Sequence, residues 1–244
     1  VLGGTIHMTN IIKLHDEQTS NSLAPQFNTF DVEPRPVYNY MGLDAEGKPL
    51  YEEVKTHFQM WDTTNDRPIP KCINGTKHLG TAYHELLEPL NEGLVSANLD
   101  KGCLVKDAIY DSGAKFVRKI SYPNITIEPK TRKEGDIIRF EIVFRSSLDG
   151  SWVHSLQILP IRLLCLNGMV GVDSNYKLIF NFKHTTGFNP SVIRDKVLIG
   201  QESFQEMKPW FESLSNAEVT TDDVKSLLKQ TLFKKQAQKD AELK

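Results

Sequence analysis

Two Asx-Gly pairs interrupt the apolar run between residues 139 and 172, and they constrain the fold more than any other feature of this sequence. Asp149-Gly150 and Asn167-Gly168 each end a short apolar segment. Both central residues of a tight hairpin turn need positive φ angles, which glycine, asparagine and aspartate tolerate best. The segment therefore predicts an antiparallel meander.

The segments around this meander also resemble strands. Asp111-Ser112-Gly113 marks a further hairpin, and Leu178, Phe180 and Phe182 follow a period of two. Several short strands with turn signals between them indicate one antiparallel sheet. The predicted strands are Cys103–Tyr110, Lys115–Ser121, Ile137–Arg145, Trp152–Ile158, Arg162–Leu166 and Lys177–Phe182.

Helices are expected on both sides of the sheet region in the sequence. Thr81 is the expected N-cap of the first helix, and Pro89 should kink it or start a second one. The next helix should be interrupted near Pro209, and Thr221 should cap the last. The predicted fold is α+β: an antiparallel β-sheet of hairpins with helices packed mainly on one face and a helical C-terminus. The predicted helices cover residues 81–97, 192–214 and 224–243.

The chain divides into four predicted parts. Residues 1–7 have the character of a cloning junction and are interpreted as a tag remnant before a native start at Met8. Residues 8–40 are polar and rich in proline, which is typical of an irregular arm. An α+β core domain is expected at 41–215, and a basic amphipathic C-terminal helix at 216–244.

The start of this core domain has the weakest pattern. Residues 37–60 alternate weakly, and a turn at 44–48 separates two candidate strands. Residues 61–79 contain Asn65-Asp66-Arg67-Pro68 and Asn74-Gly75, so we expect a loop there.

Composition narrows the class of protein only a little. The chain is 39% hydrophobic and 25% charged, which is ordinary for a globular protein. Its net charge of −2 does not mark a nucleic-acid binder, although only local patches decide phosphate contact. The cysteines Cys72, Cys103 and Cys165 form no CxxC pair, so we expect three buried thiols in a reducing cytoplasm. No apolar run is long enough to span a membrane.

The motifs of common enzyme classes are missing from the sequence. It has no P-loop, GxGxxG, HExxH or GxSxG motif, so we expect neither a cofactor nor a metal. Asp149 and Asn167 are interpreted as turn residues, and Cys165 as an inert thiol in an apolar strand. His184 follows a strand; a structural hydrogen bond is its expected role, and catalysis with Asp149 is the alternative.

Basic residues lie beside aromatic residues throughout the predicted sheet. With period-two alternation, Arg139 and Arg145 share one face, while Phe140 and Phe144 share the opposite face and belong to the core. A cationic face with Trp152 near its edge could hold a single-stranded backbone and stack bases. The alternative is the ordinary polar face of a half-buried sheet. The candidate nucleic-acid-binding residues are Lys115, Arg118, Lys119, Arg132, Arg139, Arg145, Trp152 and Arg162.

Three motifs follow one another in a distinctive order. Ser147 to Ser151 (SLDGS) precede Arg162 to Met169 (RLLCLNGM), and Lys183-His184-Thr185 comes last. In this order they resemble a family of phage- and plasmid-encoded prokaryotic proteins that contains a domain of unknown function. The similarity covers about residues 78–235. Trp152-Val153-His154 is bulkier than the small residues expected after DGS, so a shared role of that turn stays open.

The resemblance implies a mobile-element protein in the cytoplasm of a bacterial host, with no established reaction. Phage proteins of this size and class include single-stranded DNA-binding and annealing proteins, an analogy at the level of the fold. The first hypothesis is therefore a non-enzymatic single-stranded DNA-binding or annealing protein in replication or recombination, acting as a homo-oligomer away from membranes. The second is a protein-interaction module that docks through Val224–Lys244. The third is a hydrolase or nuclease that uses His184.

Overall fold

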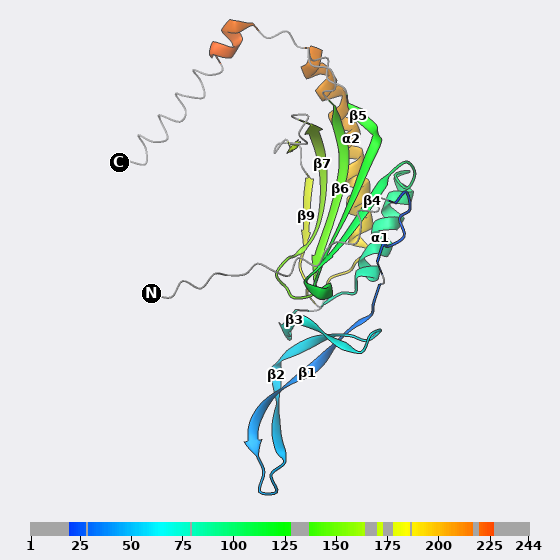
Figure 1. Ribbon diagram of the computed structural model, residues 1–244. Helices are drawn as coiled ribbons and strands as arrows, with labels where there is room; N and C mark the ends of the chain where they lie inside the picture. The colour runs from blue at the N-terminus through cyan, green and yellow to red at the C-terminus, as the bar shows by residue number, and fades with distance from the viewer. Residues whose placement is uncertain are drawn as a thin grey trace, which may run out of the picture.

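The computed structural model describes eight stretches of the chain, which form two antiparallel sheets and two long helices (Figure 1). A slender three-stranded sheet projects from a larger body of sheet and helices. The fold is therefore α+β, as predicted. The described residues are 20–27, 29–78, 80–127, 137–163, 170–172, 178–185, 187–216 and 220–226.

The projecting sheet has the order β1-β2-β3 and is formed by β1 (Val32–Leu43), β2 (Pro49–Asp62) and β3 (Arg67–Gly75). The two candidate strands and their turn are thus confirmed, but β1 begins inside the stretch predicted as an irregular arm. The loop predicted at 61–79 was wrong. The prolines of this stretch argued against a strand. They are compatible with one here because β3 lies at the edge of the sheet, where a residue without an N–H is tolerated.

The larger sheet contains six antiparallel strands. Its central strands follow one another as the predicted meander, while β7 pairs along its second edge with both β8 and β9. Pro160 does not end β7, so Arg162 belongs to that strand and not to a new one. The strands are β4 (Leu104–Tyr110), β5 (Lys115–Ile127), β6 (Ile138–Ser147), β7 (His154–Leu163), β8 (Val170–Val172) and β9 (Leu178–Phe182).

The turns of the meander fall where the sequence predicted them. The short 3-10 helix η1 (Asp111–Gly113) joins β4 to β5, and residues 148–153 join β6 to β7. Gly150 has a φ of +71°, which an L side chain rarely adopts, so glycine is needed there. The predicted turn at Asn167-Gly168 lies outside the described residues.

Helix α1 (Tyr83–Ser96) packs on strand β5 and against the second helix. It continues through Pro89, and Thr81 does not cap it, since the N-cap position is Ala82. Gly93 permits close contact with the next helix, because a Cβ there would lie 3.0 Å from the carbonyl oxygen of Arg194. The two helices therefore form one layer over the sheet.

Helix α2 (Val192–Asn216) crosses the same face of the sheet, and its Phe204 ring lies 4.3 Å from that of Phe140. Pro209 does not interrupt it. Residues 221–226 begin a further helix, but its cap is Thr220 rather than Thr221. Thr220 Oγ1 accepts from Asp223 N at 3.2 Å, while Asp223 Oδ2 accepts from Thr220 N at 2.9 Å.

The core lies between the helices and one face of the larger sheet, so the helices cover one face as predicted. Phe140 and Phe144 on β6 are fully buried there, as the alternation predicted. Cys72 and Cys103 are buried free thiols, while Cys165 lies outside the described residues. None of the described helices combines the length and the hydropathy that crossing a lipid bilayer requires.

Candidate nucleic-acid interface

The face of the larger sheet opposite the helices, here called the outer face, is basic. On β6 the core-facing residues alternate with Arg139, Glu141 and Arg145, which therefore belong to the outer face. The strand register carries this pattern to the neighbouring strands, because Lys119 pairs with Val143 and Lys106 pairs with Lys119. Among the described strand residues that face outward, Glu141 is the acidic one. The basic side chains of the outer face are Lys106, Lys115, Lys119, Arg139 and Arg145.

Trp152 lies at one end of this face, just after the turn between β6 and β7. Lys115 Nζ lies 5.5 Å and Arg145 Cζ 5.9 Å from the centre of its ring. The Tyr110 ring meets the indole edge-on, with 6.4 Å between the centroids. Indole attracts cations more strongly than the other aromatic side chains. We call Tyr110, Lys115, Arg145 and Trp152 the Trp152 cluster.

Hydrogen bonds within the turn hold Trp152 in place. Ser147 Oγ donates to Trp152 O at 3.1 Å and accepts from Trp152 N at 3.0 Å. Asp149 Oδ1 accepts from Ser151 N at 2.9 Å. Burial alone would raise the pKa of Asp149, but the bonds from Ser151 and the charge of Lys115 hold it below its usual value. The side chain of Asp149 thus acts in the turn as a charged acceptor.

Some of the predicted basic side chains form ion pairs with carboxylates, and others do not. Lys115 Nζ lies 2.7 Å from Asp111 Oδ2, and Lys119 Nζ lies 2.7 Å from Glu141 Oε2. Arg139 and Arg145 have no carboxylate partner among the described residues. The Nε atom of Arg145 is also buried without a hydrogen-bond acceptor.

The structure brings five of the predicted site residues together on or beside the outer face. Arg118 is not among them: it lies between Phe116 and Ile120 on the core side of β5 and is fully buried. Arg132 lies outside the described residues. The backbone of Arg162 pairs with Ile138 and Gly171, but its side chain is not described. The five residues are Lys115, Lys119, Arg139, Arg145 and Trp152.

Arg118 stabilises the fold and cannot contact a ligand. Its Nε and Nη2 atoms donate to the two carboxylate oxygens of Asp107 at 2.8 and 2.7 Å. Its Nη1 atom donates to Leu23 O at 3.0 Å and to Asn91 Oδ1 at 3.2 Å. The guanidinium thus joins β4, β5, α1 and the segment before β1, and it satisfies the buried charge of Asp107.

Three histidines from distant parts of the sequence form a buried cluster behind the turn. The ring of His184 lies 3.7 Å from that of His154 and 4.6 Å from that of His78, measured between centroids. Burial lowers the pKa of His154 to about 3 and that of His184 to about 4, and it lowers the pKa of His78 as well. The three rings are therefore neutral at pH 7.

Two hydrogen bonds tie the histidine cluster to the turn and to β6. His184 Nε2 donates to Trp152 O at 2.6 Å, and His154 Nδ1 shares a hydrogen bond of 2.9 Å with Ser146 Oγ. No arrangement suited to holding a metal ion occurs among the described histidines, cysteines and carboxylates. Within the described residues, no hydrogen bond joins His184 to Asp149. Sequence spacing could not reveal this cluster, because its members come from three separate loops and strands.

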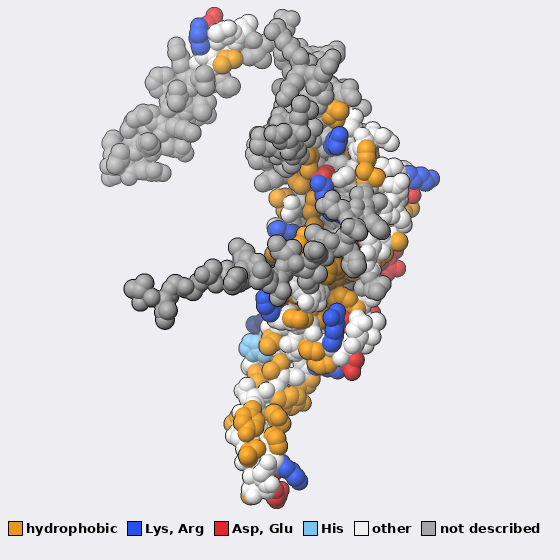
Figure 2. Space-filling model, in the orientation of Figure 1, with side chains coloured by type: hydrophobic (Ala, Val, Ile, Leu, Met, Phe, Trp, Pro, Cys, Tyr) orange, Lys and Arg blue, Asp and Glu red, His pale blue; other side chains and the backbone are white. Residues whose placement is uncertain are grey.

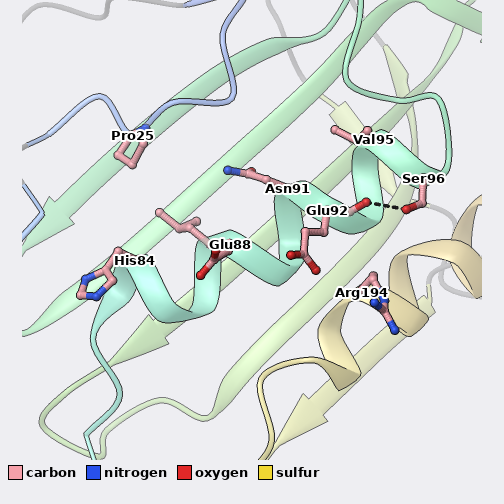
Figure 3. A pocket seen from close by; sticks show the side chains of 9 residues that line it. Pro25, His84, Glu88, Asn91, Glu92, Val95, Ser96 and Arg194 are labelled. Carbon is pink, nitrogen blue, oxygen red and sulfur yellow. Dashed lines mark hydrogen bonds between the residues drawn. The ribbon is translucent and has the colours of Figure 1, made fainter.

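A shallow groove of about 790 Å³ follows the exposed side of α1 (Figure 3). Glu88 and Glu92 line it from α1, and Arg194 lies at its far side on α2. Two carboxylates at the groove would repel a phosphate backbone. The groove therefore does not extend the basic outer face.

A comparison with protein families gives one match. The model of a domain of unknown function, DUF932, matches residues 115–244, which begin at the first residue of β5 and make up more than half of the sequence. The matched part contains three members of the Trp152 cluster, whereas Tyr110 and the projecting sheet precede it. Neither the curated proteins nor the solved structures compared with the chain gave a match.

Proposed function

Because the chain belongs to the DUF932 family, whose description names no activity, we propose a function from the geometry: the outer face binds single-stranded nucleic acid. The observation that carries this proposal is the Trp152 cluster, an indole flanked by two cations at the end of a basic sheet face. The expected ligand is single-stranded DNA of a phage or plasmid in the cytoplasm of a bacterial host, during replication or recombination.

Each part of the outer face matches one part of a single strand. Arg139 and Arg145 are free to pair with phosphates, and counterions released by such contacts favour binding. The indole of Trp152 offers a surface for a base, and a base stacked on an aromatic side chain contributes about 1–3 kcal/mol. Stacking and phosphate contact need no particular base, so the proposed binding has little sequence preference.

The distribution of charge supports this role better than the net charge does. The whole chain carries −2, yet the outward-facing strand residues include five cations and one carboxylate, and Asp111 and Asp149 beside Lys115 still leave a local excess of two positive charges. A local excess of one sign raises the concentration of the opposite charge near that surface. The chain can therefore attract a polyanion to this face despite its acidic total.

The double variant Arg139→Gln/Arg145→Gln tests the phosphate contacts. Fluorescence anisotropy with labelled single-stranded DNA across a salt series should give a slope of log K against log salt that is reduced by about 1.4, since each lost contact removes about 0.7. The variant Lys48→Gln/Lys101→Gln, with both changes at exposed sites away from the face, is the matched control. Failure of the wild-type chain to bind at low salt would refute the proposal.

Trp152→Leu tests the stacking contact separately from charge. Affinity for single-stranded DNA should fall by about 5- to 150-fold, which corresponds to the 1–3 kcal/mol of one stacked base. The salt slope should not change, because no cation has been removed. Equal affinity of Trp152→Leu and wild type in the same assay would show that the indole takes no part in binding.

A further inference from the structure

The projecting sheet ends in a long hairpin that pairs with no other strand among the residues that the structure describes. Strand β3 pairs with β2 only from His57 onward, so the part of β1 and β2 beyond this point is two-stranded. We call residues 37–56 the arm; it is the lower end of the molecule in Figure 1. An isolated two-stranded hairpin is at best marginally stable in water. The arm should therefore become more stable when another strand or surface binds to it.

The arm exposes a concentration of large apolar side chains (Figure 2). Tyr38, Tyr40 and Tyr51 are 54%, 61% and 63% exposed. The register places Tyr40 opposite Tyr51, with 6.0 Å between the ring centroids, and Tyr38 follows on the same face. Apolar patches of this kind on a polar surface mark interaction sites. The other exposed apolar residues of the arm are Met41, Leu43 and Leu50.

The outer edge of β1 is open over residues 37–43. Among the described strands, β1 pairs only with β2, and Val37–Leu43 contains neither a proline nor a charged residue. Natural proteins protect exposed edges with lysine, proline or bulges, because bare edges pair with other strands. Pro34 and Pro36 lie at the base of this edge, and the register with β2 shifts between Pro36 and Tyr38 and again between Tyr40 and Gly42. The regular, uncharged stretch Tyr38–Tyr40 is therefore the part of this edge suited to pairing.

We propose that two copies of this chain associate through the Val37–Leu43 edges, which pair antiparallel about a twofold axis. Antiparallel pairing of a segment with itself satisfies the twofold symmetry of a closed dimer. Since the segment carries no charge, self-pairing brings no like charges together. The distal edge of β2, with Glu52, Glu53 and Lys55, would place carboxylates close to one another.

Edge pairing would also bring aromatic side chains of the two copies together. A twofold axis at Asn39 places Tyr38 of each copy opposite Tyr40 of the other, on the face that also carries Tyr51. Aromatic cross-strand pairs contribute roughly 0.2–1 kcal/mol each. Pairing also joins two two-stranded hairpins into one larger sheet, which removes the marginal stability of an isolated hairpin.

Nucleic acid does not fit the arm. Residues 37–56 contain four carboxylates, Asp44, Glu46, Glu52 and Glu53, against the lysines Lys48 and Lys55. A phosphate backbone would meet net repulsion there. The inference therefore does not rest on the proposed function, which uses the basic outer face of the larger sheet and not the arm.

Asn39→Lys tests the pairing, since Asn39 is exposed in the middle of the edge. Light scattering after size exclusion, with nuclease-treated protein in high salt, should give a dimer for the wild-type chain. Asn39→Lys should weaken dimerisation by at least about tenfold, because each pair would bring two lysines into one small interface. Ala45→Lys adds the same charge in the exposed turn and should remain dimeric.

A charge-swap experiment shows whether the two edges meet each other. Asn39→Glu alone should also dissociate, whereas an equimolar mixture of Asn39→Lys and Asn39→Glu should recover a heterodimer in native mass spectrometry. A monomeric wild type at micromolar concentration would overturn the proposal, as would an Asn39→Lys variant with the wild-type mass. The same variants bound to single-stranded DNA separate the two proposals, because loss of dimer should leave the affinity of each outer face intact.

Discussion

Replacement of Arg118 by methionine should lower the free energy of unfolding by about 3–5 kcal/mol, as expected when one partner of a buried ion pair is removed. Methionine fills much of the volume but leaves the carboxylate of Asp107 buried without its two guanidinium donors. The carbonyl of Leu23 and the amide oxygen of Asn91 lose a donor as well. Urea denaturation followed by circular dichroism measures the change.

Two further variants show whether the effect comes from the uncompensated charge. Arg118→Met/Asp107→Leu removes both charges and should recover most of the lost stability, because an apolar pair of similar volume replaces a buried ion pair without penalty in many proteins. Lys119→Met alters the next residue, whose half-exposed ion pair with Glu141 contributes about 1 kcal/mol or less. Equal losses for Arg118→Met and Lys119→Met would contradict the buried-pair interpretation.

Acidification from pH 7.5 to pH 5 should lower the free energy of unfolding by about 4 kcal/mol, through the histidine cluster. The pKa values of His154 and His184 are about 3 and 4 in the folded chain, below the ordinary value of 6.5. The unfolded state therefore binds more protons between these values. The stabilisation is complete above pH 6.5, and each histidine loses about 2 kcal/mol by pH 5.

The loss of stability between pH 7.5 and pH 5 should depend on the buried histidines and not on the exposed ones. His154→Gln removes one titrating ring and should reduce the difference between pH 7.5 and pH 5 by about 2 kcal/mol. His57→Gln changes an exposed histidine and should leave that difference unchanged. Urea denaturation at the two pH values measures both differences, and a wild type of equal stability at both would show that the folded cluster takes up protons as readily as the unfolded chain does.

The sheet was predictable because its signals are local. The turn at Asp149-Gly150 and the alternation of Phe140 and Phe144 depend on residues one to four positions apart. The same alternation placed Arg139 and Arg145 on one face, and the structure puts them there. Where backbone geometry and side-chain direction repeat with a short period, a single sequence is enough to predict the turns and the two faces of a strand.

The errors arose where the partner is distant in the sequence. Arg118 is basic and lies in a strand, so it was assigned to the ligand face. Its actual position depends on Asp107 and Asn91, which only the fold brings beside it. Period-two counting from Phe116 would have placed Arg118 on the core side of β5. Nothing in the spacing of the sequence identifies an ion pair that makes that position tolerable.

The histidine cluster and β3 were missed for different physical reasons. His78, His154 and His184 meet only because the turn after β6 packs against the ends of β3 and β9. Strand β3 carries Pro68 and Pro70, which normally argue against a strand. Its edge position removes that objection, and edge position is a property of the sheet that one segment cannot reveal.

The arm can open without disturbing the core of the protein. Between Val32 and Phe58 no residue belongs to the buried core or packs against it. Opening of the arm therefore leaves the global unfolding transition nearly untouched, and its amide hydrogens should exchange long before those of β5 and β6. Substitutions there should therefore cost the body of the fold little stability, because no side chain of the core depends on this hairpin.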